Sequence, residues 1–382
     1  MTDALPSQTD ILIVGAGPVG MTLHLALAAG GQPSLLIDRR PQQTHCNDPR
    51  ALALAYGARQ LLEQIGAWPH NTATAIETIH VSQKGGFGRT LIAAADYHLP
   101  ALGYVVRYPD LAATLAARID SSNVRHGCEI AKVIDAGDHL AVTLHRDGSE
   151  HGLRTKLLVH AEGTPTGDTD VRTWIYGQHA IVAEVMPAAG GHGHRAWERF
   201  TPDGPLALLP LGDAWSVVFT LPPEKADAVM AMNDEAFVAA LQERFGPRLR
   251  LAHPSPRHRF PLALSMRIAV VRNREAWIGN GAQTLHPVTG QGFNLGLRDA
   301  WQLAEVLLDR GPDPASLKAY AAARRLDRTA TTAFTDGLVR LFSNDITPLK
   351  VARGLGLFAL DLCPPARDFV ARRMIWGARA WL

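Results

Sequence analysis

The chain has little cysteine and no excess of charge of either sign. Its 382 residues include three cysteines, and 38 Lys and Arg residues nearly balance 36 Asp and Glu residues. Cys46, Cys128 and Cys363 are far apart and form no CxxC pair, which excludes a disulfide framework and favours a reducing compartment. The chain also lacks the concentrated Lys and Arg of nucleic-acid-binding proteins, so nucleic acid is not an expected partner.

The sequence has no uninterrupted run of the roughly 18–20 apolar residues that a membrane-spanning helix needs. The most apolar early stretch, residues 11–29, is interrupted by Gly15, Gly17, Pro18 and Gly20. The first positively charged side chain is Arg39, so this stretch also lacks the charged start of a secretory signal. We therefore expect a cytoplasmic protein that does not span a membrane, while attachment to the inner membrane surface stays open.

The first 38 residues carry the pattern of a β-α-β unit. Residues 11–14 form a short, continuous apolar run, typical of a strand that is buried on both faces of a parallel sheet. From Pro18 the apolar residues follow a helical period that ends at Gly30 and Gly31, and residues 34–38 are typical of a second strand. The pattern predicts an α/β fold with a parallel sheet.

Later segments indicate a second, antiparallel sheet and a helical end. We expect a helix over 51–66, a strand over 78–82, a hairpin of strands 206–211 and 215–221, a strand over 276–279 and a helix from about Asn294 to Arg310. Helical spacing continues over 320–342 and into the C-terminus, where Trp376 and Trp381 are mixed with arginines. Two kinds of sheet in a chain of this length indicate two domains.

Gly15, Gly17 and Gly20 form a GxGxxG motif between the first strand and the helix, and Asp38 ends the next strand. Gly15 permits a tight turn, Gly17 lets the backbone approach a pyrophosphate, and Gly20 lets the helix pack on the sheet. The helix N-terminus offers unpaired N–H groups and a positive dipole end to that anion, and Asp38 can accept hydrogen bonds from a ribose. This context predicts an ADP-containing cofactor; the alternative is a glycine turn that binds nothing.

Residues 279–299 are the most specific stretch in the chain and distinguish between ADP-containing cofactors. Pro287 followed by Gly290, Gln291 and Gly292 makes a loop whose backbone can lie against a flat ring. A helix that starts near Asn294 would point its positive end at the electron-rich pyrimidine side of a flavin. The stretch favours FAD over NAD, and the alternative is a Pro and Gly connection with an Asn helix cap.

This stretch resembles the flavin-binding signature of the class A, para-hydroxybenzoate hydroxylase-like flavoprotein monooxygenases, and in detail it resembles the ubiquinone-biosynthesis hydroxylases. Other segments are similar to the 2-polyprenyl-6-methoxyphenol hydroxylase branch of that family: residues 53–57, 79–83, 86–90, 94–97, 101–107, 198–202 and 204–210. The resemblance covers nearly the full length of the chain.

The resemblance implies FAD contacts from several segments. It assigns Gly15, Gly17, Pro18 and Gly20 to the pyrophosphate, Asp38 to the ribose with Arg39 beside it, and Arg50 and Arg107 to further contacts. Glu162 stands where the family has the Asp of a second fingerprint, and Asn280 after Gly279 stands where a third signature has Asp. The other implied FAD contacts are Pro287, Gly290, Gln291, Gly292 and Asn294.

The resemblance also implies an architecture and a reaction. The fold would be a Rossmann-like FAD-binding domain of residues 1–75, 100–175 and 270–345, a smaller antiparallel-sheet substrate domain of residues 76–99 and 176–269, and a helical C-terminal segment of residues 346–382. NAD(P)H would reduce FAD, O2 would add to give a flavin C4a-hydroperoxide, and a polyprenylated methoxyphenol of ubiquinone biosynthesis would attack its distal oxygen. Such chemistry needs a dry pocket.

The residues leave alternatives open. His286 and Pro287 are the catalytic candidates, with His286 assisting proton movement; the alternative for His286 is a histidine that packs the loop. A flavin reductase or dehydrogenase and a largely non-catalytic, FAD-bound subunit of a biosynthetic complex are the alternative functions. The aromatic and basic C-terminus either lies at a membrane interface or packs on its own domain. No metal site is expected, because no histidine pair has ligand partners at suitable spacing.

Overall fold

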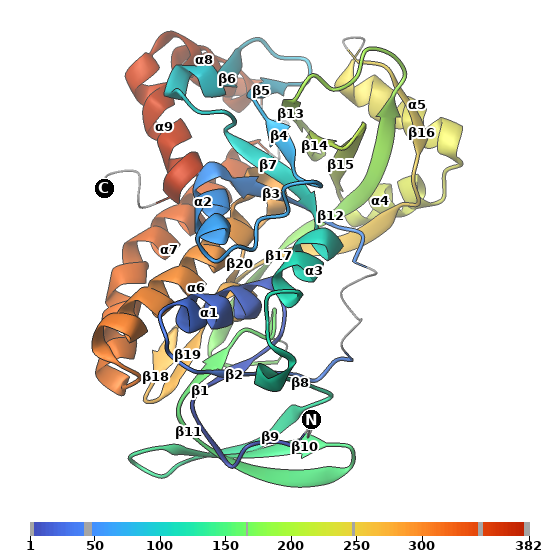
Figure 1. Ribbon diagram of the computed structural model, residues 1–382. Helices are drawn as coiled ribbons and strands as arrows, with labels where there is room; N and C mark the ends of the chain where they lie inside the picture. Colours follow the sequence, from blue (N-terminus) through green and yellow to red (C-terminus); the bar gives the residue numbers. More distant parts are fainter. Residues whose placement is uncertain (1–3, 42–47, 166, 247–248, 343–346, 378–382) are drawn as a thin grey trace.

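The computed structural model describes residues 4–41, 48–165, 167–246, 249–342 and 347–377. Cys46 and Trp381 lie outside the described residues. The described chain forms a mostly parallel sheet with helices packed against it, a larger and mostly antiparallel sheet, a small third sheet and a helical end (Figure 1). None of the described helices is both long and apolar enough to cross a membrane.

The first sheet has the strand order β18-β19-β11-β1-β2-β8. Five of these strands run parallel, and β18 is antiparallel to β19. Their bounds are β1 Gln8–Val14, β2 Leu35–Asp38, β8 Val124–His126, β11 Ser149–His160, β18 Val271–Arg272 and β19 Glu275–Trp277. With helix α1 (Pro18–Ala29) between β1 and β2, the predicted β-α-β unit is confirmed.

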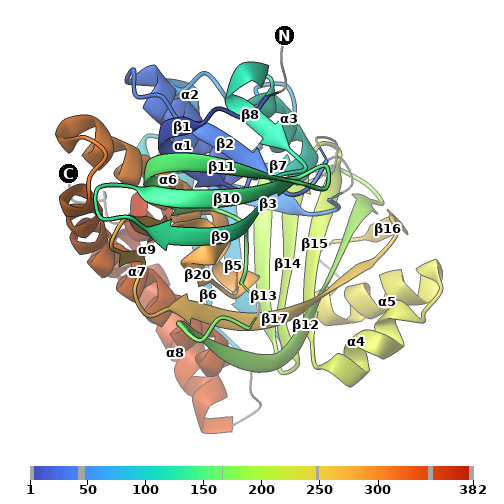
Figure 2. The same cartoon turned by 90° about the horizontal axis from the view of Figure 1, so that it is seen from below.

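The two faces of this sheet are covered by different elements. Ile11 and Ile13 face a core shared with helices α1, α3, α6 and α7, whereas Leu12 and Val14 face the hairpin of β9 and β10 (Figure 2). The bounds are α3 Tyr108–Ala116, α6 Gln291–Arg310, α7 Pro314–Phe342, β9 Glu129–Asp135 and β10 Leu140–Arg146. Because both faces of β1 are buried, its apolar run is continuous rather than alternating.

The second sheet has the order β20-β17-β12-β15-β14-β13-β5-β6, with β16 beside β12. The predicted hairpin is confirmed as β14 and β15, and the predicted strand over 78–82 as β5. Helices α4 and α5 cover one face of this sheet (Figure 2). The bounds are β5 Thr78–Gln83, β6 Arg89–Ala93, β12 Val171–Pro187, β13 Arg195–Thr201, β14 Gly204–Leu211, β15 Ala214–Leu221, β16 Leu251–Pro254, β17 His258–Arg267, β20 Gln283–Thr284, α4 Pro223–Met230 and α5 Asp234–Phe245.

A third sheet corrects part of the helix predicted over 51–66. Its strands are β3 (Ala51–Ala55), β7 (Gly103–Arg107) and β4 (Thr74–Ile76), and helix α2 (Tyr56–Gln64) begins only after β3. Leu52 and Leu54 alternate with alanines, a pattern that also fits a strand, and pairing with β7 decides between the two.

The helix predicted to start near Asn294 starts earlier, at Gln291. The last described part of the chain is helical, as predicted: α8 covers Thr347–Leu362 and α9 covers Pro364–Trp376. Short 3-10 helices occur at η2 (Ala94–Tyr97), η3 (Ser121–Asn123), η4 (Gly279–Gly281) and η5 (Pro287–Thr289). The division of the chain into domains at the expected residue numbers stays a prediction.

Candidate cofactor and substrate site

The glycine turn connects β1 to α1 and is shaped by close backbone contacts. Gly15 has a φ of +107°, and a Cβ there would lie 2.5 Å from the carbonyl oxygen of Ala161. A Cβ at Gly20 would lie 2.0 Å from the carbonyl oxygen of Gly15. At Gly17, in contrast, the nearest atom to a Cβ would be Tyr108 Oη at 3.8 Å, so the space in front of Gly17 is open.

Helix α1 starts at Pro18 without a side-chain cap, because Gly17 is its N-cap residue. The backbone N–H groups of its first turn therefore face the same open space as Gly17, with the positive end of the helix dipole behind them. A phosphate group is the ligand that such a helix N-terminus binds best.

Asp38 ends β2 beside this turn and is almost fully buried. Its Oδ2 accepts the N–H of Ala16 at 2.8 Å, and its carboxylate pairs with the Arg40 side chain at 3.0 Å. Burial raises the pKa of Asp38, but the hydrogen bonds from Arg40 and Ala16 outweigh burial and hold the pKa below its ordinary value. Arg39, the neighbour expected at this place, is exposed.

The end of β11 lies next to the glycine turn. Glu162, one of the expected FAD contacts, follows this strand by two residues. The His160 ring is stacked on Trp277, with the ring centres 4.8 Å apart, and it lies between two carboxylates. Nδ1 is 3.1 Å from Glu162 and Nε2 is 2.8 Å from Glu275. Burial lowers the pKa of His160. The two carboxylates raise this pKa by more than burial lowers it, so the pKa of His160 is above its ordinary value.

The segment at Gly279 packs directly on the start of α1. A Cβ at Gly279 would lie 3.1 Å from Val19 on that helix. The Gly279 N–H is held by Asp299 Oδ2 at 3.2 Å, while the neighbouring Asn280 is exposed. The third glycine-containing segment is thus anchored beside the first.

The Asp299 side chain that binds Gly279 belongs to a buried network of ion pairs. Asp299 also accepts hydrogen bonds from Gln283 at 2.6 Å and from Arg324 of α7 at 2.8 Å. Arg324 in turn pairs with Asp327, which also binds Arg298 at 2.8 Å. Burial raises the pKa of Asp327, but the two guanidinium groups hold it down at about 2.

The loop at the start of α6 is tied to strand β3. Gly290 has a φ of +61° and lies against Ala53, whose Cβ would be 3.3 Å from a Cβ at Gly290. Asn294 binds both segments: its Oδ1 accepts the Ala55 N–H at 2.8 Å, and its Nδ2 donates to the carbonyl oxygens of Ala53 and Gly290. Gln291 reaches α9 instead and donates to the Met374 carbonyl oxygen at 3.0 Å.

Arg50 and Tyr108 connect the two glycine-containing loops. The Arg50 guanidinium lies 5.2 Å from the centre of the Tyr108 ring, and the Tyr108 hydroxyl is the atom nearest to the position that a Cβ would take at Gly17. Arg50 directly precedes β3, which leads to Ala53 and Gly290. Arg50 and Tyr108 therefore lie between the glycine turn and the strand that leads to the Gly290 loop.

Two of the three expected cofactor-contacting arginines, Arg50 and Arg107, pair with carboxylates. Arg50 binds Asp48 at 2.6 Å, and Arg107 binds Glu184 of β12 at 2.7 Å. The second pair joins the third sheet to the second sheet.

His286 is fully buried directly before η5. Its Nδ1 accepts the Val288 N–H at 3.1 Å, so the proton of the neutral ring is on Nε2. No partner for Nε2 occurs in the described part of the chain. Burial lowers the pKa of His286 to about 4. Pro287, the next residue, is exposed, so the two catalytic candidates differ in burial.

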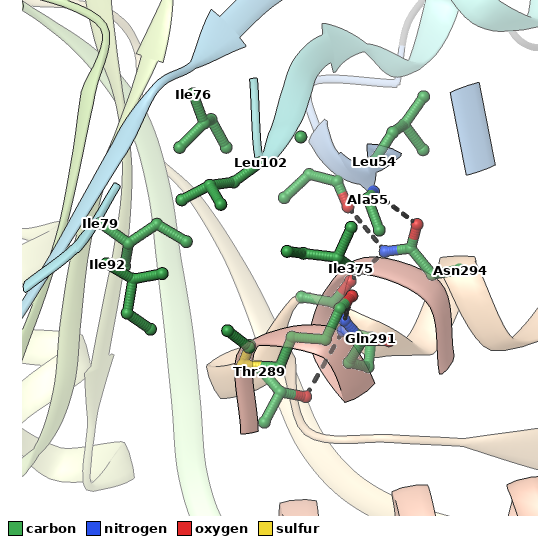
Figure 3. A pocket seen from close by; sticks show the side chains of 15 residues that line it. Leu54, Ala55, Ile76, Ile79, Ile92, Leu102, Thr289, Gln291, Asn294 and Ile375 are labelled. Carbon is green, nitrogen blue, oxygen red and sulfur yellow. Dashed lines mark hydrogen bonds between the residues drawn. The ribbon is translucent and has the colours of Figure 1, made fainter. Parts of the chain in front are cut away.

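A mostly apolar pocket lies beside Gly290 and is open to solvent, and its empty space, open solvent included, is about 510 Å³. Figure 3 shows Ile76, Ile79, Ile92 and Leu102 on one side of the pocket, and α6 with Gln291 and Asn294 and α9 with Ile375 on the other. The lining residues are Ala53, Leu54, Ala55, Ile76, Ile79, Ile92, Leu102, Gly103, Thr289, Gly290, Gln291, Asn294, Ala371, Met374 and Ile375. Gln291 and Asn294, the longer polar side chains, already bind backbone atoms, which leaves the pocket apolar in character.

Comparison with known proteins identifies the family. The model of the FAD binding domain family matches residues 8–335, which is most of the chain. The chain belongs to this family. FAD is accordingly its cofactor, and the open space at Gly17, the uncapped α1 N-terminus and the glycine loop at Gly290 fit a diphosphate and a flat ring.

Relatives of established name extend over nearly the whole chain. The ubiquinone hydroxylase UbiL of Rhodospirillum rubrum is 35% identical, with 97% of this chain and 90% of that protein covered. The 3-demethoxyubiquinol 3-hydroxylase of Escherichia coli is 31% identical, with 92% and 95% covered. Among solved structures, the p-nitrophenol 4-monooxygenase PnpA of Pseudomonas putida DLL-E4 has the same fold, with a TM-score of 0.77, 14% identity and coverage of 98% and 100%.

Several residues of this site, among them Arg40, Tyr108 and Asp299, have no assignment from the sequence alone. Arg40 lies two residues after Asp38, and an Arg so close behind the acidic residue of a β-α-β unit was the available signal. Tyr108 and the network around Asp299 act through contacts between distant segments, for which the sequence carries no local signal. Within the described residues, no group of three or more His, Cys, Asp or Glu side chains is placed to hold a metal ion.

Proposed function

We propose that this chain is an aromatic-ring hydroxylase of ubiquinone biosynthesis that acts on a polyprenylated methoxyphenol with NAD(P)H and O2. The observation that carries the proposal is the apolar pocket beside Gly290, in a chain whose named relatives are a ubiquinone hydroxylase and a demethoxyubiquinol hydroxylase. Bound FAD, once reduced by NAD(P)H, supplies the activation of O2.

The proposed FAD contacts lie mainly on the glycine turn at residues 15–20 and on the Gly290 loop. Gly15, Gly17, Pro18 and Gly20 would hold the diphosphate, and Asp38, kept ionised by Arg40, would accept hydrogen bonds from the ribose. Further proposed contacts are Arg39, Arg50, Arg107, Glu162, Gly279, Asn280, Pro287, Gly290, Gln291, Gly292 and Asn294. The carboxylate partners of Arg50 and Arg107 fix the direction of both guanidinium groups.

The pocket would bind the substrate and keep water away. Apolar side chains such as Ile79, Ile92 and Met374 suit a prenyl chain, and they offer no hydrogen bonds that would hold ordered water. Excluding water matters because water and protons divert activated oxygen to hydrogen peroxide. His286, neutral near pH 7 and with an unpaired Nε2–H, would hold a proton at that atom beside Pro287.

We also propose that helix α8 attaches the enzyme to a membrane surface. Val351, Leu355, Phe358 and Leu362 recur every three or four residues along one side of α8, and each is between 47% and 66% exposed. Arg372 on the neighbouring α9 is exposed and would suit anionic headgroups. Proximity to the membrane would give the enzyme access to a substrate with a hydrophobic tail.

Purified protein tests the proposed function. We expect bound FAD with a flavin spectrum, consumption of NAD(P)H and O2 that the methoxyphenol stimulates, and one oxygen atom from isotopically labelled O2 in the product. Substrate oxidation that proceeds without O2 would favour the reductase or dehydrogenase instead. A colourless protein that cannot be reconstituted with FAD would exclude both.

A further inference from the structure

Glu198 lies in the middle of β13 on the face of the second sheet that carries the pocket. It is paired with Val81 of β5 on one side and with Ala207 of β14 on the other. Ile79, two residues before Val81 and therefore on the same face of β5, lines the pocket. The Glu198 side chain is therefore on the same face of the sheet as the pocket-lining Ile79, although Glu198 itself is not among the residues that line the pocket.

The guanidinium group of the next residue, Arg199, does not pair with Glu198. Successive side chains of a strand point to opposite faces, and Arg199 follows this rule. Its guanidinium binds the carbonyl oxygen of Arg244 at 2.9 Å and lies 3.3 Å from Ser82 Oγ, on the side covered by α5.

An apolar cluster on the same face as Glu198 includes a residue of the Pro287 loop. Phe200, two residues along the same face of β13, packs in one apolar cluster with Val81 and Val288. Val288 is the residue after Pro287. Glu198 is therefore placed between a residue that lines the pocket and residues that contact the loop.

The carboxyl group of Glu198 has an unsatisfied, buried oxygen. Oε1 has no hydrogen-bond partner in the described residues. Burial raises the pKa of Glu198 to about 8, so that the group is mostly neutral near pH 7. A buried polar group without a partner destabilises a fold, so its presence calls for an explanation, and a ligand that satisfies it is one such explanation.

We propose that Glu198 binds the ring oxygens of the substrate and thereby decides which ring carbon faces the Pro287 loop. A neutral carboxyl offers one O–H donor and one carbonyl acceptor. A phenol with a neighbouring methoxy group offers the complement, namely one O–H donor and one acceptor oxygen. The inference rests on the proposed function, because it assumes that a methoxyphenol enters the pocket.

Two Glu198 variants and two ligands test the assignment. Glutamine keeps a donor and an acceptor, whereas leucine keeps neither. The ligands are a methoxyphenol with a short prenyl chain and its methyl ether, in which the hydroxyl is blocked. Binding to FAD-loaded enzyme is followed by the change in flavin absorbance, and Glu129→Leu, on an exposed position of β9, is the matched control.

We expect wild type, Glu198→Gln and Glu129→Leu to prefer the phenol by roughly tenfold or more over the ether, and Glu198→Leu to lose that preference. Glu198→Leu should also raise the unfolding temperature of the apoprotein, because it removes an unsatisfied polar group from an apolar face. A merely structural carboxyl predicts the opposite change in temperature. The inference is wrong if Glu198→Leu keeps the wild-type ligand preference, whereas the proposed function fails only if wild type does not hydroxylate the phenol.

Discussion

Asn294, at the start of α6, holds the backbone of Ala55 at the end of β3, 239 positions earlier in the chain, through a 2.8 Å hydrogen bond from the Ala55 N–H to Oδ1. The Asn294 amide group also binds the carbonyl oxygens of Ala53 at 2.8 Å and Gly290 at 2.7 Å. One buried side chain therefore fixes the Gly290 loop against the strand that leads back to Arg50 and the glycine turn.

Replacing Asn294 by leucine should loosen this junction. Three backbone groups lose their partner, and each unsatisfied buried group costs about 1–3 kcal/mol, so we expect the free energy of unfolding to fall by about 3 kcal/mol or more. Urea unfolding of the apoprotein measures the change. The exposed Asn71→Leu is the control and should stay within about 0.5 kcal/mol of wild type. Equal stability of Asn294→Leu and wild type would contradict the role of this side chain.

Gly17→Val should abolish FAD retention and leave the fold intact. The valine side chain would enter the open space in front of Gly17, where we place the diphosphate, without meeting protein backbone. The measurement is the ratio of flavin to protein after gel filtration, together with the circular dichroism spectrum. Gly152→Val, at an exposed strand position with open space around it, is the control and should keep its flavin. Unchanged flavin content in Gly17→Val would remove the diphosphate from this turn.

The low pKa of His286 predicts a loss of stability in mild acid. The ring takes up its proton near pH 6.5 in the unfolded chain but only near pH 4 in the folded one, where burial lowers the pKa. Between these values the unfolded state binds more protons, so the free energy of unfolding decreases as the pH falls. From about pH 7 to about pH 5 the decrease should be about 2 kcal/mol. Urea unfolding of the apoprotein at both pH values measures it.

His286→Gln should lack this part of the pH dependence. If the variant and wild type lose the same stability between the two pH values, the buried ring of His286 is not the group that responds.

The exposed apolar stripe on α8 should carry vesicle binding. We expect Leu355→Glu with Phe358→Glu to reduce co-sedimentation with anionic phospholipid vesicles by at least about tenfold, because two large apolar side chains leave the interface and two negative charges enter it. Ile175→Glu is the control, since Ile175 is 84% exposed but lies on β12. Vesicle binding that survives the double substitution but not Ile175→Glu would place the membrane contact elsewhere.

Local patterns made the first part of the fold predictable. The continuous apolar run of β1, the glycine turn and the helical period of α1 each depend on residues that are neighbours in sequence. The hairpin of β14 and β15 was also accessible, because Gly212 and Asp213 separate two apolar runs. For the same reason the sequence could indicate an ADP-containing cofactor before any geometry was known.

Features that depend on distant partners were not predictable. Residues 51–55 form a strand because β7 pairs with them, and a pattern of alternating leucine and alanine does not reveal that partner. Glu198 became a candidate only when its neighbours Val81 and Ala207, from two other strands, placed it on the pocket side of the sheet. The buried pairing of Asp299 with Arg324 likewise joins α6 to α7 without a local signal.

A crystal structure of the FAD-reconstituted protein tests the central claim most directly. The claim is that the Gly15–Gly20 turn and the Gly290–Gly292 loop hold opposite ends of one FAD molecule. We expect the diphosphate at Gly17 and the flavin ring along the backbone of Gly290–Gly292, with its edge at the apolar pocket. Electron density for the flavin ring away from Gly290, or for a diphosphate away from Gly17, would contradict the account.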